Sequence, residues 1–245
     1  MRESRERVRA AIQNCGFTFP QRKIIVNLAP ADLPKEGGRY DLPIALGVLC
    51  AARLLKPVDE AKLATHEFLG ELALDGELRA VRGVLPASRC ATAAGRTLVV
   101  PFASASEAAL ADGATVLKAS HLNEVAAYIA DSGTLSVERS DVVARQPSYL
   151  DFADVRGQPT ARRAVEVAAA GGHNLLLVGP PGSGKSMLAA RLPGILPPFT
   201  PGEALETSMV HSVAGTLGVG GVLADRPFRD PHHSASMPAL IGGGM

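Results

Sequence analysis

The sequence predicts an α/β fold in two parts, a mixed α/β domain followed by the first part of a domain with a phosphate-binding loop. Strand-like and helical patterns alternate through the first 130 or so residues. The stretch 131–149 loses hydrophobic periodicity and gains serine, glycine and charge. A GxxxxGK[ST] motif follows at 179–186. We therefore predict domains at 1–132 and 150–245, joined by a linker at 133–149.

Composition excludes several classes of protein. The chain has 245 residues, and 47% of them are apolar, which is ample for a packed core. Lys and Arg number 25 against 24 Asp and Glu, so the net charge of +1 gives no broad electrostatic footprint for nucleic acid or membrane. Aromatic residues make up 4% and tryptophan is absent, which argues against a base-stacking platform.

Cysteine spacing and the first residues indicate a cytoplasmic protein. Cys15, Cys50 and Cys90 are far apart and form no CxxC pair, so neither a zinc site nor a disulfide framework is expected. The start is densely charged where a signal peptide needs an apolar core, and no run approaches the ~20 apolar residues of a membrane span.

The first part reads as alternating strands and helices. The run 24–29 is β-branched and aliphatic and ends at Pro30, which predicts a strand, and 41–55 reads as a helix. Asp75-Gly76 predicts a two-residue hairpin turn with positive φ at both positions. The remaining pattern predicts a helix over 85–95, a strand over 97–101, a helix opened by a capping box from Ser104 to Glu107, a strand over 115–119 and a helix over 120–130.

The second part places its glycine-rich motif between a strand and a helix. A helix is predicted over 158–172, with Pro159 in its first turn and Gly171-Gly172 at its end. The run 175–178 is continuously apolar, as in a buried parallel strand. Helical sequence follows until Pro193. A second capping box then introduces a helix over 203–215, and it consists of Thr200, Pro201 and Glu203.

The motif at 179–186 predicts a site for ATP and Mg²⁺. Gly182 and Gly184 let backbone N–H groups turn inward around phosphates, and the following helix N-terminus adds partial positive charge. Lys185 is expected to reach the β- and γ-phosphates, and the Ser186 hydroxyl to ligate Mg²⁺. The alternative is a glycine-rich turn with an exposed lysine. The candidate nucleotide-binding residues are Gly179, Pro180, Pro181, Gly182, Ser183, Gly184, Lys185 and Ser186.

Hydrolysis needs more than this loop. An acidic residue at the end of a downstream strand must hold the metal-bound water, and another residue must orient the attacking water. After Ser186 the acidic residues are Glu203 and Glu206, in the capped helix, and Asp225 and Asp230, in a predicted loop. None follows an apolar strand, so no complete catalytic set is predicted.

Several long motifs, in order, carry a resemblance to a known family. "DVRGQPTARRAVEVAAAGGHNLLLVGPPGSGKSMLAARLPGILPP" and "RPFRDPHHSASMPALIGGG" resemble the magnesium-chelatase-like AAA+ ATPases of the ComM/YifB group. "RESRERVRAAI", "NLAPADLPKEGGRYDLPIALG" and "GELALDGELRAVRGVLP" resemble the N-terminal domain of the same group. The fold so implied is a Lon-protease-like (S5-like) α/β domain followed by the N-terminal part of a P-loop AAA+ domain.

The resemblance also implies a function. Members of this group are bacterial hexameric motors, and the best-understood kind is a helicase that drives branch migration while DNA is integrated during natural transformation. It implies ATP as fuel, DNA as partner and a homo-hexamer as the assembly. Gly157 and Gln158 match the segment that lies beside the adenine in AAA+ folds.

The Lon-like domain is expected to lack peptidase activity. In Lon the serine of the catalytic dyad lies in a PKDGPSAG segment, and the matching "PKEGGRYD" has Arg39 at that position. The matching "RGVLPA" has Leu85 at the position of the lysine. Nucleophile and base are both replaced.

The sequence departs from the family pattern at its ends. Full family members begin a few tens of residues earlier and continue into an acidic Walker B strand, a sensor and an arginine finger, so we expect the chain to correspond to the middle of a longer protein. Only the phosphate-loop half of the site carries over. Two alternatives to a DNA motor stay open: a non-hydrolysing nucleotide-binding, interaction or non-functional fragment, and a metal-insertion motor like magnesium chelatase.

Basic residues form two candidate contacts for nucleic acid. Arg2, Arg5 and Arg9 share a helical face, but interleaved glutamates favour a solvated face with local ion pairs. Arg226 and Arg229 are the better candidates, with a solvated loop as the alternative.

Histidines do not predict a metal site. His232 and His233 are adjacent and point in different directions in extended chain, and no carboxylate or cysteine spacing completes a site with them or with His211. In the resembling family "PHH" belongs to the ATPase domain, near the ring pore, so a substrate-contacting or structural role stays open.

Overall fold

The chain divides into two compact units, which are described separately. The computed structural model describes residues 2–30, 37–55, 59–139, 149–218, 221–232 and 234–237. The first unit comprises Met1–Val143 and Leu205–Val222, and the second comprises Ala144–Ala204 and Leu223–Met245. The predicted second domain, 150–245, thus shares residues 205–222 with the first unit in the structure. Among the described residues no helix is long and apolar enough to cross a membrane.

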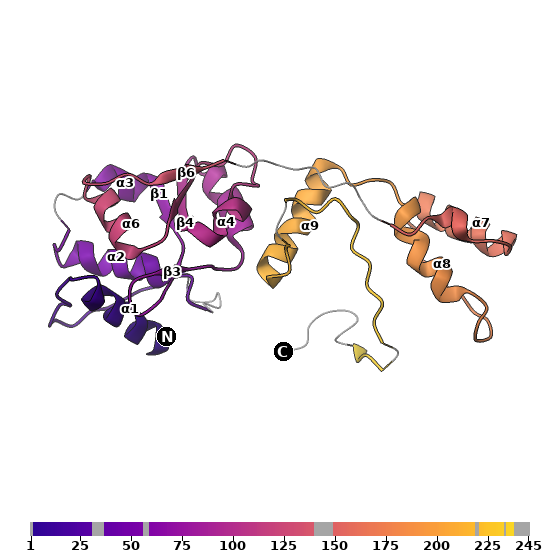
Figure 1. The fold of residues 1–245 in the computed structure, drawn as a ribbon, viewed down its shortest axis with the longest axis horizontal. Helices are drawn as coiled ribbons and strands as arrows, with labels where there is room; N and C mark the ends of the chain where they lie inside the picture. Colours follow the sequence, from indigo (N-terminus) through magenta and orange to yellow (C-terminus); the bar gives the residue numbers. More distant parts are fainter. Residues whose placement is uncertain are drawn as a thin grey trace. The chain divides into compact units, whose positions relative to one another are not determined.

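A four-stranded sheet forms the centre of the first unit (Figure 1). Its order is β1-β4-β5-β6, in which β1, β4 and β5 run parallel and β6 runs antiparallel to β5. The register pairs Phe68 with Val99 and Val99 with Leu117. The strand bounds are β1 (His66–Phe68), β4 (Thr97–Pro101), β5 (Val116–Ala119) and β6 (Ser136–Glu138). The parallel strands confirm the α/β class, because parallel neighbours require crossover connections.

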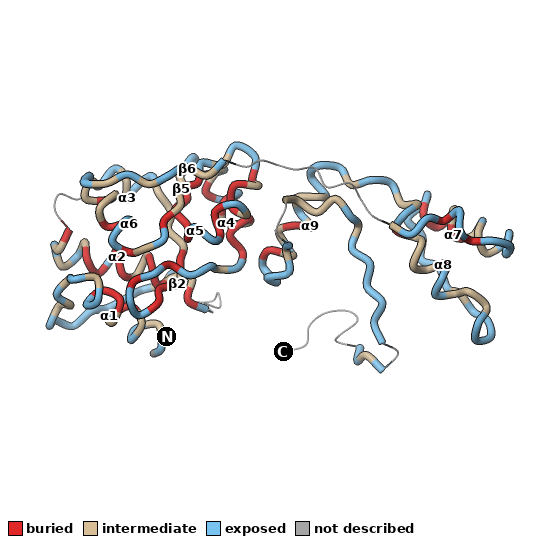
Figure 2. The backbone as a smooth tube through the Cα atoms, in the orientation of Figure 1, coloured by how far each residue is buried: buried red, intermediate tan, exposed pale blue. Residues whose placement is uncertain are grey.

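Helices cover both faces of this sheet. Leu98 and Val100 of β4 pack in one core cluster with α4 and α5, and Val99 packs in another with α1, α2 and α6. The alternation follows from the two-residue period of a strand. All three residues are buried. Figure 2 draws the buried stretches of this unit in red. The helices of this unit are α1 (Arg2–Asn14), α2 (Asp41–Ala51), α3 (Glu60–Thr65), α4 (Val84–Ala93), α5 (Phe102–Ala108) and α6 (Leu122–Ile129).

The predicted hairpin is present, but its turn differs from the prediction. The hairpin pairs β2 (Glu71–Leu72) with β3 (Leu78–Arg79). The connection is a five-residue loop, in which Ala73 N–H donates to Glu77 O at 2.9 Å. Only Gly76 has positive φ, 97°. The Asp75 carboxylate instead accepts a bond from Glu77 N–H at 3.1 Å, which holds the loop without a left-handed aspartate.

The predicted strand at 24–29 is wrong as a paired strand. Residues 23–28 have no regular secondary structure, and no sheet partner is assigned to them among the described residues. Ile25 is 79% exposed. The sequence preference for a strand is real, but a ladder needs a second strand whose backbone groups can pair with it.

Two helix ends also differ from the predictions. The helix predicted over 41–55 ends at Ala51, and Arg53 just beyond it has a φ of 56°. The predicted capping box from Ser104 to Glu107 is wrong, because α5 begins at Phe102 directly after β4. Ser104 is buried inside the helix, and its hydroxyl accepts a bond from Val81 N–H at 3.2 Å.

The stretch 131–149 is not linker throughout. Its residues Ser136–Glu138 form β6, which completes the sheet beside β5. Lys118 Nζ and Glu138 Oε2 approach to 2.5 Å across this strand pair, which favours the antiparallel register. Residues 140–148 of the predicted linker lie outside the described residues.

The second unit is built from short elements around a small core. It contains η1 (Phe152–Asp154), α7 (Pro159–Gly171), α8 (Lys185–Arg191) and η2 (Leu192–Ile195), and α9 (Pro201–Ala214) begins in it. Its core cluster consists of Phe152, Val155, Val165 and Leu188, with Leu177 packed against them. Pro159 at the start of α7 and left-handed Gly172 at its end confirm the predicted helix signals.

The capping box at the start of α9 is confirmed, whereas the buried strand predicted over 175–178 is wrong. Thr200 N–H donates to Glu203 Oε2 at 2.8 Å, and Glu203 N–H donates to Thr200 Oγ1 at 3.3 Å. Residues 173–180 have no regular secondary structure and pair with no strand among the described residues. Leu176 and Val178 are 85% and 84% exposed, because no neighbouring strand is present in the described part of this unit.

Candidate nucleotide-binding site

The glycines of the loop at 179–186 give it a conformation that side chains disfavour. Gly182 and Gly184 have φ values of 76° and 83°. Gly184 is the residue before α8, and Leu188 N–H donates to its carbonyl at 3.0 Å as the first helical turn closes. Helix α8 therefore begins at Lys185, as the sequence predicts, and continues directly into η2.

Lys185 points back into the loop. Its ammonium donates to the carbonyl oxygens of Gly179 at 2.9 Å and Pro180 at 2.8 Å, and lies 3.3 Å from the Ser183 hydroxyl. The side chain is half-buried. The glycine-rich turn thus encloses its lysine, unlike a turn whose lysine extends freely into solvent.

Gln158 ties the loop to α7. Its side-chain amide donates to Ser183 O at 2.7 Å. A Cβ built at Gly184 would lie 3.0 Å from the Gln158 amide nitrogen, which leaves little room for a side chain at this position. Gln158 has a φ of 51°, an unusual value for a residue with a side chain, and it immediately precedes α7. The structure therefore places Gln158 beside the loop, which spacing alone does not reveal.

The donor set fits a nucleoside triphosphate with Mg²⁺. Lys185 supplies a cation, the backbone of 182–186 supplies N–H groups, and exposed Ser186 supplies a hydroxyl oxygen on the first turn of α8. Gly157, with a φ of 75°, precedes Gln158.

Family models match both parts of the chain. Residues 151–245 match "Magnesium chelatase, subunit ChlI", and residues 1–104 match "Subunit ChlI of Mg-chelatase". The competence protein ComM of Haemophilus influenzae is 47% identical over 249 residues. The chain belongs to the magnesium-chelatase-like ComM/YifB family.

Two other family members are equally similar. The uncharacterized YifB proteins of Salmonella typhimurium and Escherichia coli are each 47% identical, over 244 and 247 residues. All of this chain aligns with these relatives and with ComM, but it covers 48% of each of them. The chain therefore spans about half the length of the curated relatives it matches.

The acidic residues after the loop have other structural roles or lie in irregular chain. Glu203 caps α9, and its bonds to Thr200 lower the pKa of the Glu203 carboxyl. Glu206 is exposed on the same helix, and Asp225 and Asp230 are exposed in a loop. Among the described residues after 186 there is no strand to carry an acidic residue at its end.

Arg226, a candidate nucleic-acid contact, bonds to other residues of its own unit, and its role toward nucleic acid stays a prediction. Its Nε donates to Pro197 O at 2.7 Å, its backbone N–H donates to the Tyr149 hydroxyl at 2.5 Å, and its guanidinium lies 4.5 Å from the Phe199 ring centroid. The solvated-loop alternative is wrong for this side chain. Arg229 is exposed and stays a candidate.

The other basic candidates lie on α1. Arg5 pairs with Glu6 at 3.5 Å, and the Arg9 guanidinium lies 5.6 Å from the Phe19 ring centroid. The pair of Arg5 with Glu6 is a local ion pair of the kind that the interleaved charges favoured, whereas the contact of Arg9 with Phe19 is not an ion pair. The side chain of Arg2 lies outside the described residues.

The histidines bond locally. His232 Nδ1 lies 2.7 Å from Ser234 Oγ, and His211 Nδ1 lies 2.9 Å from Thr216 Oγ1. His233 lies outside the described residues. No group of three or more potential metal ligands occurs among the described histidines, cysteines and carboxylates.

The two positions matched to the Lon dyad differ in environment. Leu85 is fully buried in α4, whereas Arg39 is half-buried. A Cβ built at Gly83, the residue before α4, would lie 3.6 Å from an Arg39 guanidinium nitrogen, so Arg39 reaches the start of that helix.

Proposed function

We propose that this chain binds ATP and Mg²⁺ through Gly179–Ser186. The observation that carries the proposal is the loop geometry, in which left-handed Gly182 and Gly184 wrap the Lys185 ammonium directly before a helix. The family match supports nucleotide use in general terms.

Each residue of the loop has a defined part in binding. The Lys185 ammonium exchanges its bonds to the Gly179 and Pro180 carbonyls for bonds to the β- and γ-phosphates, which are stronger acceptors because they are charged. The Ser186 hydroxyl would hold Mg²⁺, and the ion would neutralise phosphate charge. Gly157 and Gln158 would lie beside the adenine, as the family resemblance implies, and Gln158 keeps the loop in place through Ser183.

A fluorescent-nucleotide titration tests this site. Lys185→Ala is expected to lower ATP affinity about tenfold or more, since a charge-assisted bond to phosphate contributes about 1.5–3 kcal/mol. Arg163→Ala is the matched control, because it removes one exposed cation from α7 of the same unit. Unchanged affinity in the Lys185 variant would remove the assignment.

We further propose that the whole protein is a cytoplasmic, homo-hexameric motor that couples ATP hydrolysis to DNA branch migration. The similar protein from Haemophilus influenzae is named a competence protein, which supports a role in handling incoming DNA. The N-terminal domain, 1–132, would be a Lon-like domain without a catalytic dyad, joined by 133–149 to the ATPase domain. The test is strand exchange on a synthetic four-way junction by the full-length protein; no ATP-dependent exchange would refute this role.

A second candidate, nucleotide binding without hydrolysis, is favoured for this chain by the positions of its acidic residues. The carboxylates after Ser186 lie on α9 or in a loop, and Glu203 is engaged by Thr200 and Arg226. Steady-state phosphate release from the purified chain that disappears in Lys185→Ala would exclude this candidate.

The family descriptions also favour a metal-insertion motor, since both name a magnesium chelatase subunit. Affinity capture by the full-length protein separates the two motors. Recovery of tetrapyrrole-modifying enzymes without DNA would place the metal-insertion motor first.

A further inference from the structure

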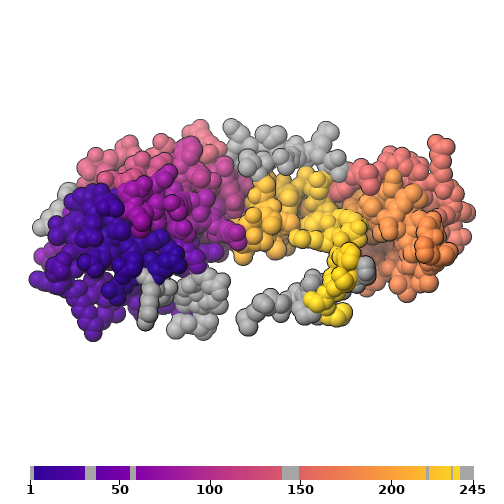
Figure 3. All heavy atoms as spheres, turned by 60° about the horizontal axis from the view of Figure 1, so that its bottom comes forward, coloured from indigo at the N-terminus to yellow at the C-terminus, as the bar shows by residue number. Residues whose placement is uncertain are grey.

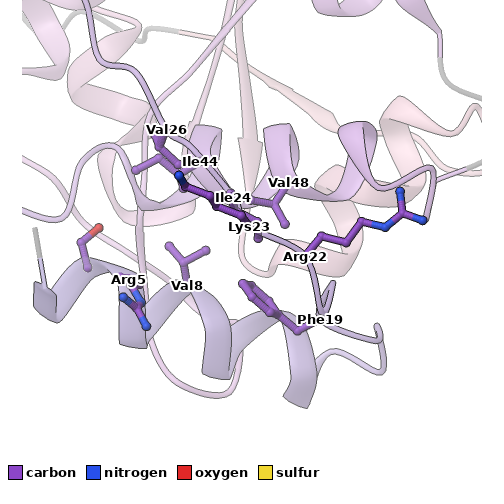
Figure 4. A pocket seen from close by; sticks show the side chains of 10 residues that line it. Arg5, Val8, Phe19, Arg22, Lys23, Ile24, Val26, Ile44 and Val48 are labelled. Carbon is purple, nitrogen blue, oxygen red and sulfur yellow. The ribbon is translucent and has the colours of Figure 1, made fainter.

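The cavity shown in Figure 4 is built by the first unit alone. It has a volume of about 570 Å³ and lies between α1 and α2. Its described lining residues all fall within 4–48, whereas the phosphate loop belongs to the second unit. The described contacts that support the loop come from the second unit.

Residues 151–158, the base-side segment, are attached to both ends of α8. Beside the last residue of α8, the Arg191 Nε donates to Asp151 O at 3.0 Å. Just before its first residue, the Gln158 side-chain amide donates to Ser183 O at 2.7 Å. Helix α8 has seven residues and is therefore about 10 Å long. The base-side segment thus runs in the direction opposite to α8 and reaches the phosphate loop at its own far end.

Apolar packing holds the middle of the base-side segment. Phe152 and Val155 share a core cluster with Leu188 of α8 and Val165 of α7. Phe152 is 7% exposed, and Val155 is fully buried. Figure 3 shows the salmon-coloured residues of α7 packed against the orange residues of α8 and η2. The segment therefore cannot shift along α8 without breaking this cluster.

Arg191 makes three contacts with one guanidinium. Besides the bond to Asp151 O, its Nη1 donates to Met187 O at 3.3 Å, and its Nη2 lies 3.4 Å from the Asp154 carboxylate. The Arg191 side chain is 15% exposed, but that of Asp154 is 60% exposed, so the ion pair contributes little. The bond to Met187 O fixes the guanidinium on α8 itself. Arg191 therefore holds the start of the base-side segment mainly through the Asp151 carbonyl.

The far end of the base-side segment is open to a ligand. Gln158 bonds to the phosphate loop, and Gly157 before it has a φ of 75°. A Cβ built at Gly157 would meet no atom of the described residues within 4 Å. Because glycine has no side chain, a planar base can approach this backbone closely.

We propose that Arg191 is a positioning residue for the nucleoside part of the bound nucleotide, an inference that rests on the proposed binding of ATP at 179–186. Arg191 acts through the base-side segment. By fixing its start on α8, Arg191 keeps Gly157 and Gln158 at a set distance from the phosphates. A segment that is already ordered loses less conformational freedom when the base binds, which raises the affinity for ATP.

Calorimetric titration of the intact chain with Mg-ATP and with Mg-tripolyphosphate tests this role. Tripolyphosphate presents phosphates to the loop without a nucleoside. Arg191→Ala is expected to lower the affinity for ATP about tenfold and to change the affinity for tripolyphosphate about twofold at most. Lys185→Ala is expected to weaken the binding of both ligands, because the phosphates are common to them.

Two matched variants and a local measurement complete the test. Arg163→Ala removes a 76% exposed arginine of α7, and Asp154→Asn removes the exposed charge beside Arg191. Each should change the affinity for either ligand about twofold at most. Amide hydrogen exchange at 152–155 should rise in Arg191→Ala and stay unchanged in α9, which distinguishes local release of the segment from unfolding.

Two results would overturn the role of Arg191 and leave the phosphate site standing. One is an equal loss of affinity for ATP and tripolyphosphate in Arg191→Ala, which would show a general structural role. The other is an unchanged affinity for ATP in that variant. A chain that binds neither ligand, or a Lys185→Ala variant that binds both as tightly as before, would refute the phosphate site and this proposal together.

Discussion

A buried carboxylate should control the stability of the first unit. The Asp41 side chain is 1% exposed, and it accepts bonds from Ser4 Oγ at 2.5 Å, Arg7 Nε at 2.9 Å and Leu72 N–H at 3.4 Å. It therefore joins α1, α2 and the β2–β3 hairpin. The bond to Asp41 is the main reason that the pKa of the Arg7 guanidinium is raised.

Asp41→Asn removes the charge and keeps the shape. Breaking a buried ion pair from one side costs about 3–5 kcal/mol, because the remaining charge stays buried without its partner. Arg7 is 20% exposed and retains Glu3 at 2.9 Å, so the lower end applies, and we expect a loss of about 3 kcal/mol. Glu3→Ala is the matched control, since it removes the 88% exposed partner of the same arginine and should cost under about 1 kcal/mol.

Urea unfolding followed by circular dichroism gives the free energies, and amide hydrogen exchange in α2 assigns the loss to the first unit. The double variant Arg7→Leu with Asp41→Leu should lose much less than the two single variants summed, since no lone charge remains. A loss under about 1 kcal/mol for Asp41→Asn, or additive losses in the double variant, would show that the pair does not act as a buried unit.

Three further predictions concern a turn, a histidine and an arginine. Gly76→Ala should destabilise the chain by more than about 2 kcal/mol, because the added Cβ would lie 2.3 Å from the Cys15 thiol. Gly95→Ala is the control: its φ is also positive, but the added Cβ would meet no atom within 4 Å, so it should cost about 1 kcal/mol. Equal losses of unfolding free energy in urea would contradict this prediction. Burial lowers the pKa of His66 in the folded state. The contribution of the neutral imidazole to folding stability is therefore full above the unfolded-state pKa of about 6.5, and it is lost as pH falls toward the folded-state pKa. His66→Gln should therefore flatten the decline in stability between about pH 7 and 5, and an unchanged slope would exclude His66 as its source. Arg226→Ala should raise the amide hydrogen-exchange rates near residues 196–200, because it removes the bonds to the Pro197 and Pro198 carbonyls. Arg229→Ala should leave these rates unchanged. Equal rates in the two variants would show that the contacts of Arg226 do not stabilise this segment.

The most predictable elements are those whose sequence signal does not depend on distant residues. The strand at 97–101 is a continuous apolar run that fits a position covered on both faces. Helix α7 begins at a proline and ends at a glycine that satisfies the end locally. The capping box of Thr200 and Glu203 forms because both partners lie within one helical turn.

Tertiary contacts determine the elements that the sequence predicted wrongly or missed. Ser104 and Glu107 have capping-box spacing, but the strand before them runs straight into a helix, and the Ser104 hydroxyl is needed by the Val81 amide. The strand at 136–138 has weak local periodicity and forms because β5 offers it an edge. The hydrogen bond from Gln158 to Ser183 joins positions 25 residues apart, and no local sequence pattern predicts it.

In the candidate nucleotide-binding site, too, some features could be predicted from the sequence and others could not. The order Gly182, Gly184, Lys185 predicts the turn, because glycine adopts positive φ without a steric penalty and the helix must start after it. The inward position of the lysine and the anchoring by Gln158 emerge only in three dimensions. Arg226 shows the converse, because a basic residue in a loop suggests a contact with phosphate, yet its guanidinium is engaged by carbonyls of its own unit.

The two predicted strands that lack partners, 24–29 and 175–178, were mispredicted for the same physical reason. β-branched and aliphatic runs favour extended backbone, but that backbone gains hydrogen bonds only when a second strand is beside it. In the segment before the phosphate loop, Leu177 packs against the small core, whereas Leu176 and Val178 are exposed. The packing of Leu177 supports the start of the loop, the Lys185 ammonium binds the Gly179 and Pro180 carbonyls, and Gln158 and α8 hold the other end. A strand paired with 175–178 would fix the segment that leads into the loop, so nucleotide affinity should rise when such a strand is present.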